Sequence, residues 1–579
     1  MKIMEIFRDR ALREELLRVA RGEKRAEFVI KDANVVNVCS GEIHEADIAI
    51  HKGIIVGVGR YKGIKEEDAR GNFAVPGLID GHTHIEMSML SVSEFARVVV
   101  PRGTTAVVAD PHEIANVLGV AGIEAMLEEA KTTPLKVFFT VPSCVPSTSL
   151  ETAGASIGAS EVENLLRCCE EFVGLAEVMD FDAVLRGDPE IFAKIEAAVK
   201  SGKAVDGHAP LLSGCELNAY ILSGAGSDHE SISAEEAREK LRLGMRVMVR
   251  EGSAAKNLRA IAPVLKECDT RNCMLVTDGD RTPKDLLSQG HMDFLLRRAI
   301  EEGIDPVKAV QLCTINPATW FNLREIGSIT PGKIADIVIV RNLERFEVLK
   351  VFVNGREISR EFRKKGKFKY PKQGRSVNAP HVSAEDFILE EEKACRLTGK
   401  RRKARVIRLI ENEIVTEAKI EEIIGIEAPK ILKAAVVERH HRTGNIGIGF
   451  VEGFGLNSGA IASTIAHDSH NIVVIGTNER DMALACNRLS EIGGGIVLCE
   501  SGFVVSEIPL PIAGLMSDES VERVLERCER LEAELRKRGC SLDAIYTLSF
   551  IALPVIPSLR ITDKGLVDVE RGEVVQVFL

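Results

Sequence analysis

The chain has 579 residues, of which 45% are hydrophobic and 28% charged, and this balance excludes an intrinsically disordered protein. At roughly 100 to 200 residues per domain, this length predicts about three to five domains, or fewer if one of them is a large barrel. The formal net charge of −11 argues against broad attraction to nucleic acids or membranes.

We expect a cytoplasmic protein with reduced thiols. The longest uncharged apolar stretches, such as residues 544–559, contain prolines and fall short of the about 20 residues that cross a bilayer. The first 25 residues are rich in charge and lack the apolar core of a signal peptide. The 13 cysteines include no CxxC pair, so the sequence predicts neither a thiolate zinc site nor a disulfide framework.

The chain opens with a helix and half of a small β-module. Residues 6–20 have the pattern of a charged amphipathic helix, and the Val- and Ile-rich runs FVIKDANVVNV, ADIAIHKGIIVGVG and FAVPGLID follow. Similar runs, GSITPGKIADIVIV and VLKVFVNGREI, return only after residue 326. We expect the two halves to pair as one sheet layer, with residues 1–74 forming the helix and first half and residues 321–376 the second half and a basic linker.

Between these halves, eight buried β-runs alternate with helical stretches such as residues 161–170 and 189–200. The third run ends at Val141, and the other seven end in polar residues: His84, Asp110, Glu177, His208, His229, Arg250 and Asp278. Buried runs separated by helices predict parallel βα units, and eight units predict a (β/α)8 barrel over residues 75–320. Active sites of such barrels lie at the carboxyl ends of the strands, where these polar residues fall.

The last part of the chain predicts a further α+β domain over residues 377–579. It contains Gly-rich apolar segments and a charged helix at residues 520–538. Basic residues gather just before and within its start, at residues 360–375 and 396–408. Because the whole chain is acidic, we interpret both clusters as solvated linker rather than as a nucleic-acid patch.

The first barrel strand carries a metal-binding pattern. Residues two apart on a strand point to the same face, so His82 and His84 of GHTH can direct both imidazoles at one point. Four more candidate ligands end the fourth, fifth, sixth and eighth strands: Glu177, His208, His229 and Asp278. Six nitrogen and oxygen ligands exceed the four of one tetrahedral ion, and a carboxylate on strand four could bridge two ions. The sequence therefore predicts a binuclear centre of Zn, Mn or Fe, among which affinity order alone does not choose.

Such a centre implies hydrolytic chemistry. A bridged pair of ions lowers the pKa of bound water and creates a hydroxide that can attack an electrophilic carbon. Asp278 can accept a proton from it and return that proton to the leaving group, as hydrolysis of a C–N bond requires. Spacing alone thus predicts a metallohydrolase without naming its substrate.

Several long motifs narrow this prediction. They are PGLIDGHTH, DPHEIANV (residues 110–117), GLAEVMDF (174–181), DGHAP (206–210), SDHE (227–230), AHDSHNIVVIGTN and SFIALPVIPSLRITDKGLVDV. Together they resemble the amidohydrolase superfamily and, within it, the bacterial and archaeal adenine deaminases, over nearly the whole chain. The resemblance implies hydrolysis of adenine to hypoxanthine and ammonia in purine salvage, with Mn or Fe as the metal. It implies a small-molecule substrate and no nucleic-acid or membrane partner. It does not decide whether the protein forms a homo-oligomer.

Three alternatives were weighed against this interpretation. Many related barrel hydrolases, such as hydantoinases and dihydroorotases, carry a carboxylated lysine where this chain has Glu177, so the glutamate favours adenine deaminases. A non-catalytic barrel scaffold would lack metal ligands, whereas all six are present here. The deaminase architecture with an HxE and PCxxC zinc site is excluded because no CxxC exists.

Deamination of adenine needs a second proton-transfer group, because N1 of the ring must gain a proton as C6 is attacked. Asp110, His112 and Glu113 follow the second strand on the same rim, and we take Glu113 as the candidate donor. A structural loop network is the open alternative for this segment. Asp110, His112 and Asp228 are candidates for supporting the ligands or contacting the substrate.

The last domain carries a further group of candidate residues. His467, Asp468 and His470 lie in a Gly- and Ser-rich stretch. We expect them to form an interdomain network, and the alternatives are that they cap the mouth of the barrel or bind another ion.

Overall fold

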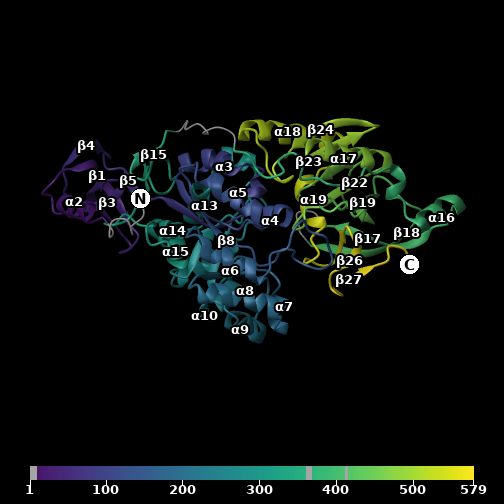
Figure 1. Cartoon of the computed structure of the whole chain (residues 1–579), viewed down its shortest axis with the longest axis horizontal. Coiled ribbons are helices and arrows are strands. Elements are labelled where there is room, and N and C mark those ends of the chain that lie inside the picture. Colours follow the sequence, from purple (N-terminus) through teal and green to yellow (C-terminus); the bar gives the residue numbers. More distant parts are fainter. Residues whose placement is uncertain (1–8, 360–367, 411–414) are drawn as a thin grey trace.

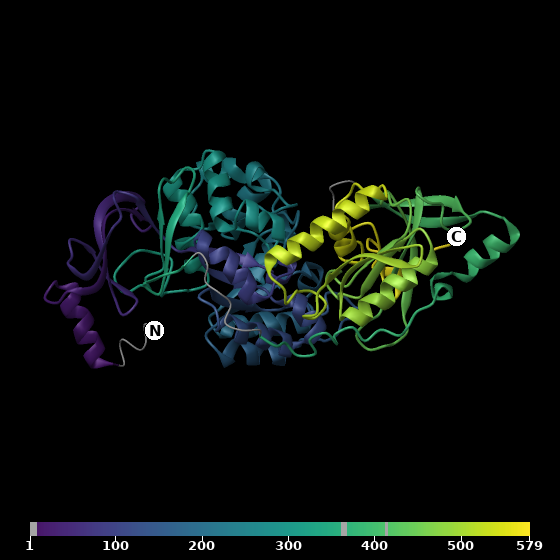
Figure 2. The ribbon, with the colours of Figure 1, turned by 90° about the horizontal axis from the view of Figure 1, so that it is seen from above.

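The computed structural model describes residues 9–359, 368–410 and 415–579. Three bodies follow one another along the long axis of the molecule, with the N-terminal β-module at one end, the barrel in the middle and the C-terminal domain at the other end (Figures 1 and 2). Among the described residues, no helix is both long enough and apolar enough to span a membrane.

The two halves of the β-module form a single sheet, which confirms their expected pairing. The strand order is β16-β15-β14-β5-β1-β2-β3, and β4 pairs with β1. The halves join where β14 runs antiparallel to β5. The elements are α2 (Arg10–Ala20), β1 (Ala26–Asn37), β2 (Glu42–His51), β3 (Ile54–Gly59), β4 (Gly63–Asp68), β5 (Phe73–Pro76), β14 (Ile337–Val340), β15 (Val348–Val353) and β16 (Arg356–Glu357). Of the predicted helix at residues 6–20, residues 6–8 lie outside the described residues.

The eight predicted βα strands are all present and lie in parallel, which confirms the (β/α)8 barrel. Five follow the order β10-β9-β8-β7-β6 and three the order β11-β12-β13. The two arcs meet where the backbone N–H of Asp278 donates to His82 O and that of Gly226 donates to Val205 O, both at 3.0 Å. The strands are β6 (Leu78–Thr83), β7 (Thr104–Ala109), β8 (Lys136–Val141), β9 (Phe172–Val178), β10 (Ala204–Gly207), β11 (Ser227–Asp228), β12 (Arg246–Arg250) and β13 (Cys273–Val276).

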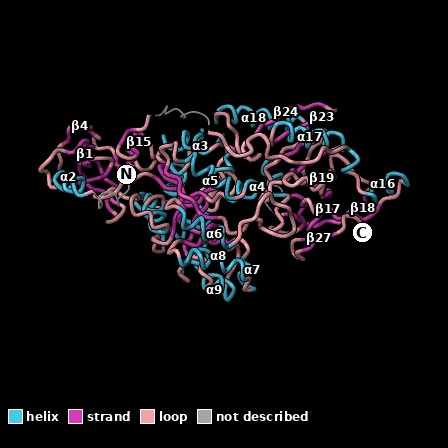
Figure 3. Tube along the Cα trace, viewed as in Figure 1, coloured by secondary structure: helices cyan, strands magenta, loops and turns pink. Residues whose placement is uncertain are grey.

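Helices surround these strands, as Figure 3 shows in cyan around magenta. Alternate residues of a barrel strand therefore face different cores: Ala106 and Val108 of β7 pack in the barrel interior, whereas Val107 and Ala109 pack among the surrounding helices. The helices are η1 (Ile85–Ser88), α3 (Val92–Val99), η2 (Val100–Arg102), α4 (His112–Leu118), α5 (Val120–Ala130), α6 (Ala159–Cys168), α7 (Phe181–Arg186), α8 (Pro189–Lys200), α9 (Gly214–Leu222), α10 (Ala234–Arg242), α11 (Leu258–Glu267), α12 (Pro283–Ser288), α13 (Met292–Glu301), α14 (Pro306–Leu312) and α15 (Ile315–Trp320).

The C-terminal domain is built on a sheet of eight strands in the order β18-β17-β20-β19-β22-β21-β23-β24, with a second sheet of three strands, β25-β26-β27. Its elements are η3 (Ala384–Phe387), α16 (Glu390–Thr398), β17 (Arg402–Leu409), β18 (Thr416–Ile423), β19 (Ile431–Val437), β20 (Ile446–Glu452), β21 (Ala460–Ser463), β22 (Ile472–Gly476), α17 (Glu479–Ile492), β23 (Gly495–Glu500), β24 (Phe503–Pro509), α18 (Val521–Lys537), α19 (Ala544–Ile551), β25 (Leu559–Thr562), β26 (Gly565–Asp568) and β27 (Glu573–Val575). The charged helix expected at residues 520–538 is α18.

The interpretation of residues 396–408 as linker is wrong. These residues form the end of α16 and most of β17. Ala404 and Val406 of β17 are buried, whereas Arg402 and Arg408 are exposed, so the strand keeps an apolar face toward the core beneath its basic side chains. The other basic cluster, at residues 360–375, lies partly outside the described residues.

Candidate metal centre

The six predicted ligands meet at the carboxyl end of the barrel. His82 and His84 come from the end of β6, Glu177 from β9, and His208, His229 and Asp278 from the turns after β10, β11 and β13. The carboxylate of Asp278 contacts both imidazoles of β6, the first barrel strand. Its Oδ1 lies 3.2 Å from His82 Nε2 and 3.1 Å from His84 Nε2.

Glu177 occupies the middle of the group. Its Oε1 lies 3.5 Å from His84 Nε2, and its Oε2 lies 2.8 Å from His208 Nδ1 and 3.1 Å from His229 Nε2. The carboxylate thus faces the strand-one side with one oxygen and the strand-five and strand-six side with the other. This is the position that a residue bridging two ions requires.

The donor atoms fit divalent cations. Nitrogen or oxygen atoms of His82, His229 and Asp278 lie within 4.8 Å of one another, and so do those of Glu177, His208 and His229. His82 Nε2 is buried and makes no well-aligned hydrogen bond among the described residues, although Asp278 Oδ1 lies 3.2 Å away, and a cation between the two atoms would satisfy both. The site holds no thiolate, so its nitrogen and oxygen ligands suit Zn, Mn or Fe.

The charges of these residues support the same conclusion. Burial raises the pKa of Glu177 and Asp278, but the imidazoles around them outweigh burial and hold both pKa values well below their usual range. Burial lowers the pKa of His84 and His229, but the same carboxylates raise both to about 10. The site therefore attracts protons in the absence of other cations, and a divalent ion would take their place because metal ligands must be deprotonated.

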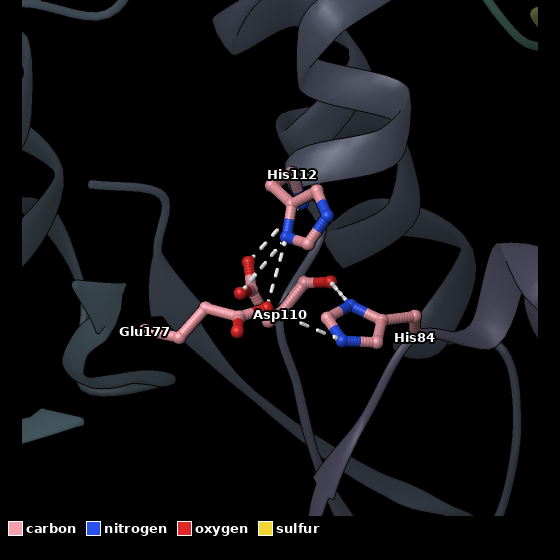
Figure 4. Close-up of side chains that lie close together, drawn as sticks. All are labelled: His84, Asp110, His112 and Glu177. Carbon is pink, nitrogen blue, oxygen red and sulfur yellow. Dashed lines mark hydrogen bonds and ion pairs between the residues drawn. The ribbon is translucent and has the colours of Figure 1, made fainter. Parts of the chain in front are cut away.

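Asp110 and His112 support the ligands from strand two (Figure 4). The backbone carbonyl of Asp110 accepts a hydrogen bond of 2.9 Å from His84 Nδ1, which leaves His84 Nε2 free to bind a metal. The side chain of Asp110 accepts from His112 Nδ1 at 3.0 Å, and the same nitrogen lies 3.6 Å from Glu177 Oε1. Both residues thus lie beside the ligands, as Figure 4 shows.

Asp228 lies behind the ligands rather than among them. Its carboxylate accepts hydrogen bonds from Lys240 Nζ at 2.8 Å and from the backbone N–H of Ala209 at 2.9 Å. The Asp228 and Lys240 side chains are fully buried. This ion pair fixes the backbone directly after His208 and directly before His229.

Glu113 lies in the first turn of α4 and contacts the C-terminal domain. Its Oε1 lies 2.7 Å from His467 Nδ1 and 3.5 Å from His112 Nε2, and its Oε2 contacts His470 Nε2. Burial raises the pKa of Glu113, but the neighbouring imidazoles, led by His467, hold it well below its usual range. Asp468 is buried beside them, with Oδ1 at 3.9 Å from His112 Nε2. The structure thus brings the three C-terminal candidates to the strand-two rim.

The tautomer of His470 favours an interdomain network over another ion. The backbone N–H of Ala466 donates to His470 Nδ1 at 3.1 Å, so the ring hydrogen lies on Nε2. Nε2 points at Glu113 and donates to it. A metal ligand would need a lone pair on that nitrogen.

Arg250 and Glu230 were missed by the sequence interpretation. Arg250 ends β12, and its Nη1 lies 2.7 Å from both Asp278 Oδ2 and Glu230 Oε1. Two signals could have found them, since Arg250 ends the seventh predicted strand just as the ligands end others, and Glu230 follows His229 in SDHE. The partly buried guanidinium of Arg250 beside Asp278 helps to keep this carboxylate ionised.

Comparisons with known proteins match both parts of this architecture. The model of the amidohydrolase family matches residues 73–358, and that of the adenine deaminase C-terminal domain matches residues 408–573. An adenine deaminase of Archaeoglobus fulgidus is 53% identical over 565 residues, covering 97% of both chains. Those of Methanothrix thermoacetophila and Desulfatibacillum aliphaticivorans are 45% and 44% identical, each covering 98% of this chain and 99% of the relative. With matches of this extent across barrel and C-terminal domain alike, the chain belongs to the adenine deaminase family of amidohydrolases.

Proposed function

We propose that the protein hydrolyses adenine to hypoxanthine and ammonia in purine salvage, using two divalent ions at the rim of the barrel. The observation that carries this proposal is the position of Glu177, which faces His84 on one side and His208 and His229 on the other. Relatives named adenine deaminases that align along nearly the whole chain supply the identity of the substrate.

Six residues would hold the ions: His82, His84, Glu177, His208, His229 and Asp278. We propose manganese or iron, with zinc as a third candidate, because every donor is nitrogen or oxygen. When bound, two such ions act as Lewis acids and make water acidic enough to yield a nucleophile near neutral pH.

Asp278 is the proton carrier at the attacked carbon. Its Oδ1 faces His82 and His84, and its Oδ2 accepts from Arg250 at 2.7 Å, so the carboxylate is ionised and fixed in direction. It takes a proton from the attacking water and delivers it to the departing amine at C6. Arg250 is a positioning residue that holds Asp278 in place for both transfers.

Glu113 and His467 supply the proton to N1 of the ring. Because Glu113 is ionised at rest, the proton is held on His467 Nδ1, which lies 2.7 Å from Glu113 Oε1. Burial lowers the pKa of His467, but the charge of Glu113 raises it above the usual value for histidine. Glu113 would relay this proton to the ring as the charge on N1 develops, and the second proton of the attacking water, lost from the C6 oxygen as the amine departs, would return to His467.

The free base is the proposed substrate, and the cytoplasm the proposed location. A pocket covered by the C-terminal domain would leave buried polar groups unpaired when a ribose enters at N9, so adenosine should be a poor substrate. All 13 cysteines are free thiols, which suits a reducing compartment.

The experiment is an assay of metal-reconstituted protein with adenine, adenosine, cytosine and dihydroorotate, following ammonia release and, for dihydroorotate, ring opening. The proposal expects ammonia from adenine far above the other substrates. Ring opening of dihydroorotate without adenine deamination would contradict it.

A further inference from the structure

Helix α19 of the C-terminal domain carries two aromatic rings on one face. Tyr546 and Phe550 are four residues apart, and their ring centroids lie 4.7 Å from each other. Both side chains are only partly buried, whereas Ala544 and Leu548 of the same helix are buried. The pair therefore leaves aromatic surface uncovered on this helix.

This helix is fixed to the loop that reaches the strand-two rim. The backbone N–H of His467 donates to Ser549 O at 2.8 Å, and the His467 ring lies 4.8 Å from the Phe550 ring at an interplanar angle of 34°. His467 in turn contacts Glu113, which lies beside His112. Phe550 thus packs on His467, the residue that holds the proton of the proposed N1 relay.

Charges of the strand-eight side of the rim act on the other ring of the pair. Burial raises the pKa of Tyr546, and so do the carboxylates of Asp280 and Asp278, against the lowering effect of Arg250. Phe550 thus packs on His467 of the strand-two side, whereas Tyr546 experiences the charges of Asp278 and Arg250.

The residues of the rim are not equally covered. The side chains of His208, Asp278 and Arg250 are 24%, 14% and 14% exposed, whereas those of His82 and Glu177 are 2% and 5% exposed. Asp278 and Arg250, whose charges act on Tyr546, are thus among the less covered residues of the rim. Aromatic rings bind the flat faces of bases by offset stacking, without reading their edges.

We propose that Tyr546 and Phe550 form an aromatic wall on which the purine ring of the substrate stacks, so that the C-terminal domain binds the substrate directly. The inference rests on the proposed function and names residues that bind the ring face. Stacking is made in the ground state as well as in the transition state, so the wall lowers KM and leaves kcat nearly unchanged.

The test uses full-length, metal-loaded protein carrying Tyr546→Phe, Tyr546→Leu or Phe550→Leu. Phe503→Leu is the matched control, because Phe503 is 74% exposed on β24. Each leucine variant in the wall should raise KM for adenine and the dissociation constant of hypoxanthine by about 5- to 100-fold. The control should stay within about twofold of wild type, and Tyr546→Phe, which keeps the ring, should raise KM far less than Tyr546→Leu.

Leucine variants that bind hypoxanthine as tightly as wild type would contradict the proposal that the two rings bind the purine. So would variants that lose kcat at unchanged KM, because that result assigns the rings a structural role in holding His467. Thermal unfolding and metal content are measured on every variant and identify any variant that has lost its fold or its ions. Because Tyr546→Leu and Phe550→Leu each remove a different ring, they test the aromatic wall independently. A wild type that neither deaminates nor binds adenine would instead contradict the proposed function.

Discussion

Nδ1 of His467, in the C-terminal domain, lies 2.7 Å from Oε1 of Glu113, on the first turn of barrel helix α4. Both side chains are buried. A residue from each of the two domains thus forms one ion pair next to the metal ligands. The C-terminal domain is therefore part of the active site in this account.

The first prediction concerns this ion pair. Glu113→Gln cannot accept and pass on the proton of His467, so kcat for adenine should fall by about 10² to 10⁴ while both metal ions stay bound. The matched control is His441→Ala, which removes another interdomain hydrogen bond, from His441 Nε2 to Ala153 O at 2.9 Å, away from the ligands. Steady-state kinetics with metal analysis checks both. A fully active Glu113→Gln would move the N1 donor elsewhere, with His229 next to examine.

The second prediction concerns Asp278. Asp278→Asn keeps the shape of the side chain but cannot carry a proton, so kcat should fall by at least about 10² to 10⁴, with a smaller effect on substrate binding. Asp269→Asn, on the turn before β13, serves as the control for an exposed carboxylate and should retain activity. An unchanged kcat in metal-replete Asp278→Asn would refute the assignment.

The third prediction concerns the bridge between the ions. Glu177→Gln removes the negative charge that lies between the two groups of imidazoles, so the protein should lose at least one of about two ions on dialysis. Elemental analysis of dialysed wild type and variant measures this directly. Retention of both ions at full rate would show that Glu177 does not bridge them.

The fourth prediction concerns Arg250. His82, His84 and His229 lower the pKa of Asp278, and the Arg250 charge adds to this effect, so Arg250→Met should raise that pKa and move the acid limb of the kcat profile to higher pH. Arg250→Lys keeps a cation and should restore part of the shift. An acid limb at the wild-type pH in Arg250→Met would contradict the positioning role.

The fifth prediction concerns the pH dependence of stability. Burial and the charge of Arg439 hold the pKa of His440 well below its ordinary value of 6.5. His440 stays neutral in the folded state, whereas in the unfolded state it takes up a proton below about pH 6.5. The free energy of unfolding therefore decreases as pH falls below this value. Between pH 7.5 and 5.5, Tm should therefore fall more steeply for wild type than for His440→Gln. Parallel Tm curves would contradict this.

The barrel and the convergence of the six candidate ligands could be predicted because a local sequence signal marks the ends of the strands. A buried apolar run followed by one polar residue is a local signal, and it marks even β11, which has only two residues, through His229. The geometry of a closed barrel then brings distant strand ends together without further information. That the two halves of the β-module share one sheet could be predicted from similar Val- and Ile-rich runs on either side of the barrel, but the specific pairing of β5 with β14 could not.

An interdomain network of His467, Asp468 and His470 was expected from the sequence, but its partner on the barrel could not be predicted. His470 and Glu113 are 357 residues apart, and no periodicity in either segment shows which face meets the other. The basic residues at 396–408 were misread because charge was weighed without the alternating burial of β17. Tyr546 and Phe550 lie in an apolar run, where pattern alone does not distinguish core residues from residues that face a substrate.

The most direct test of the account is ammonia release from adenine by metal-free full-length protein titrated with Mn²⁺. The account predicts that the rate rises with added metal, reaches its plateau at about two equivalents per chain, and yields hypoxanthine as the product. Adenosine under the same conditions should release little ammonia. A plateau at one equivalent would contradict the binuclear centre, and no hypoxanthine at any metal content would contradict the proposed function itself.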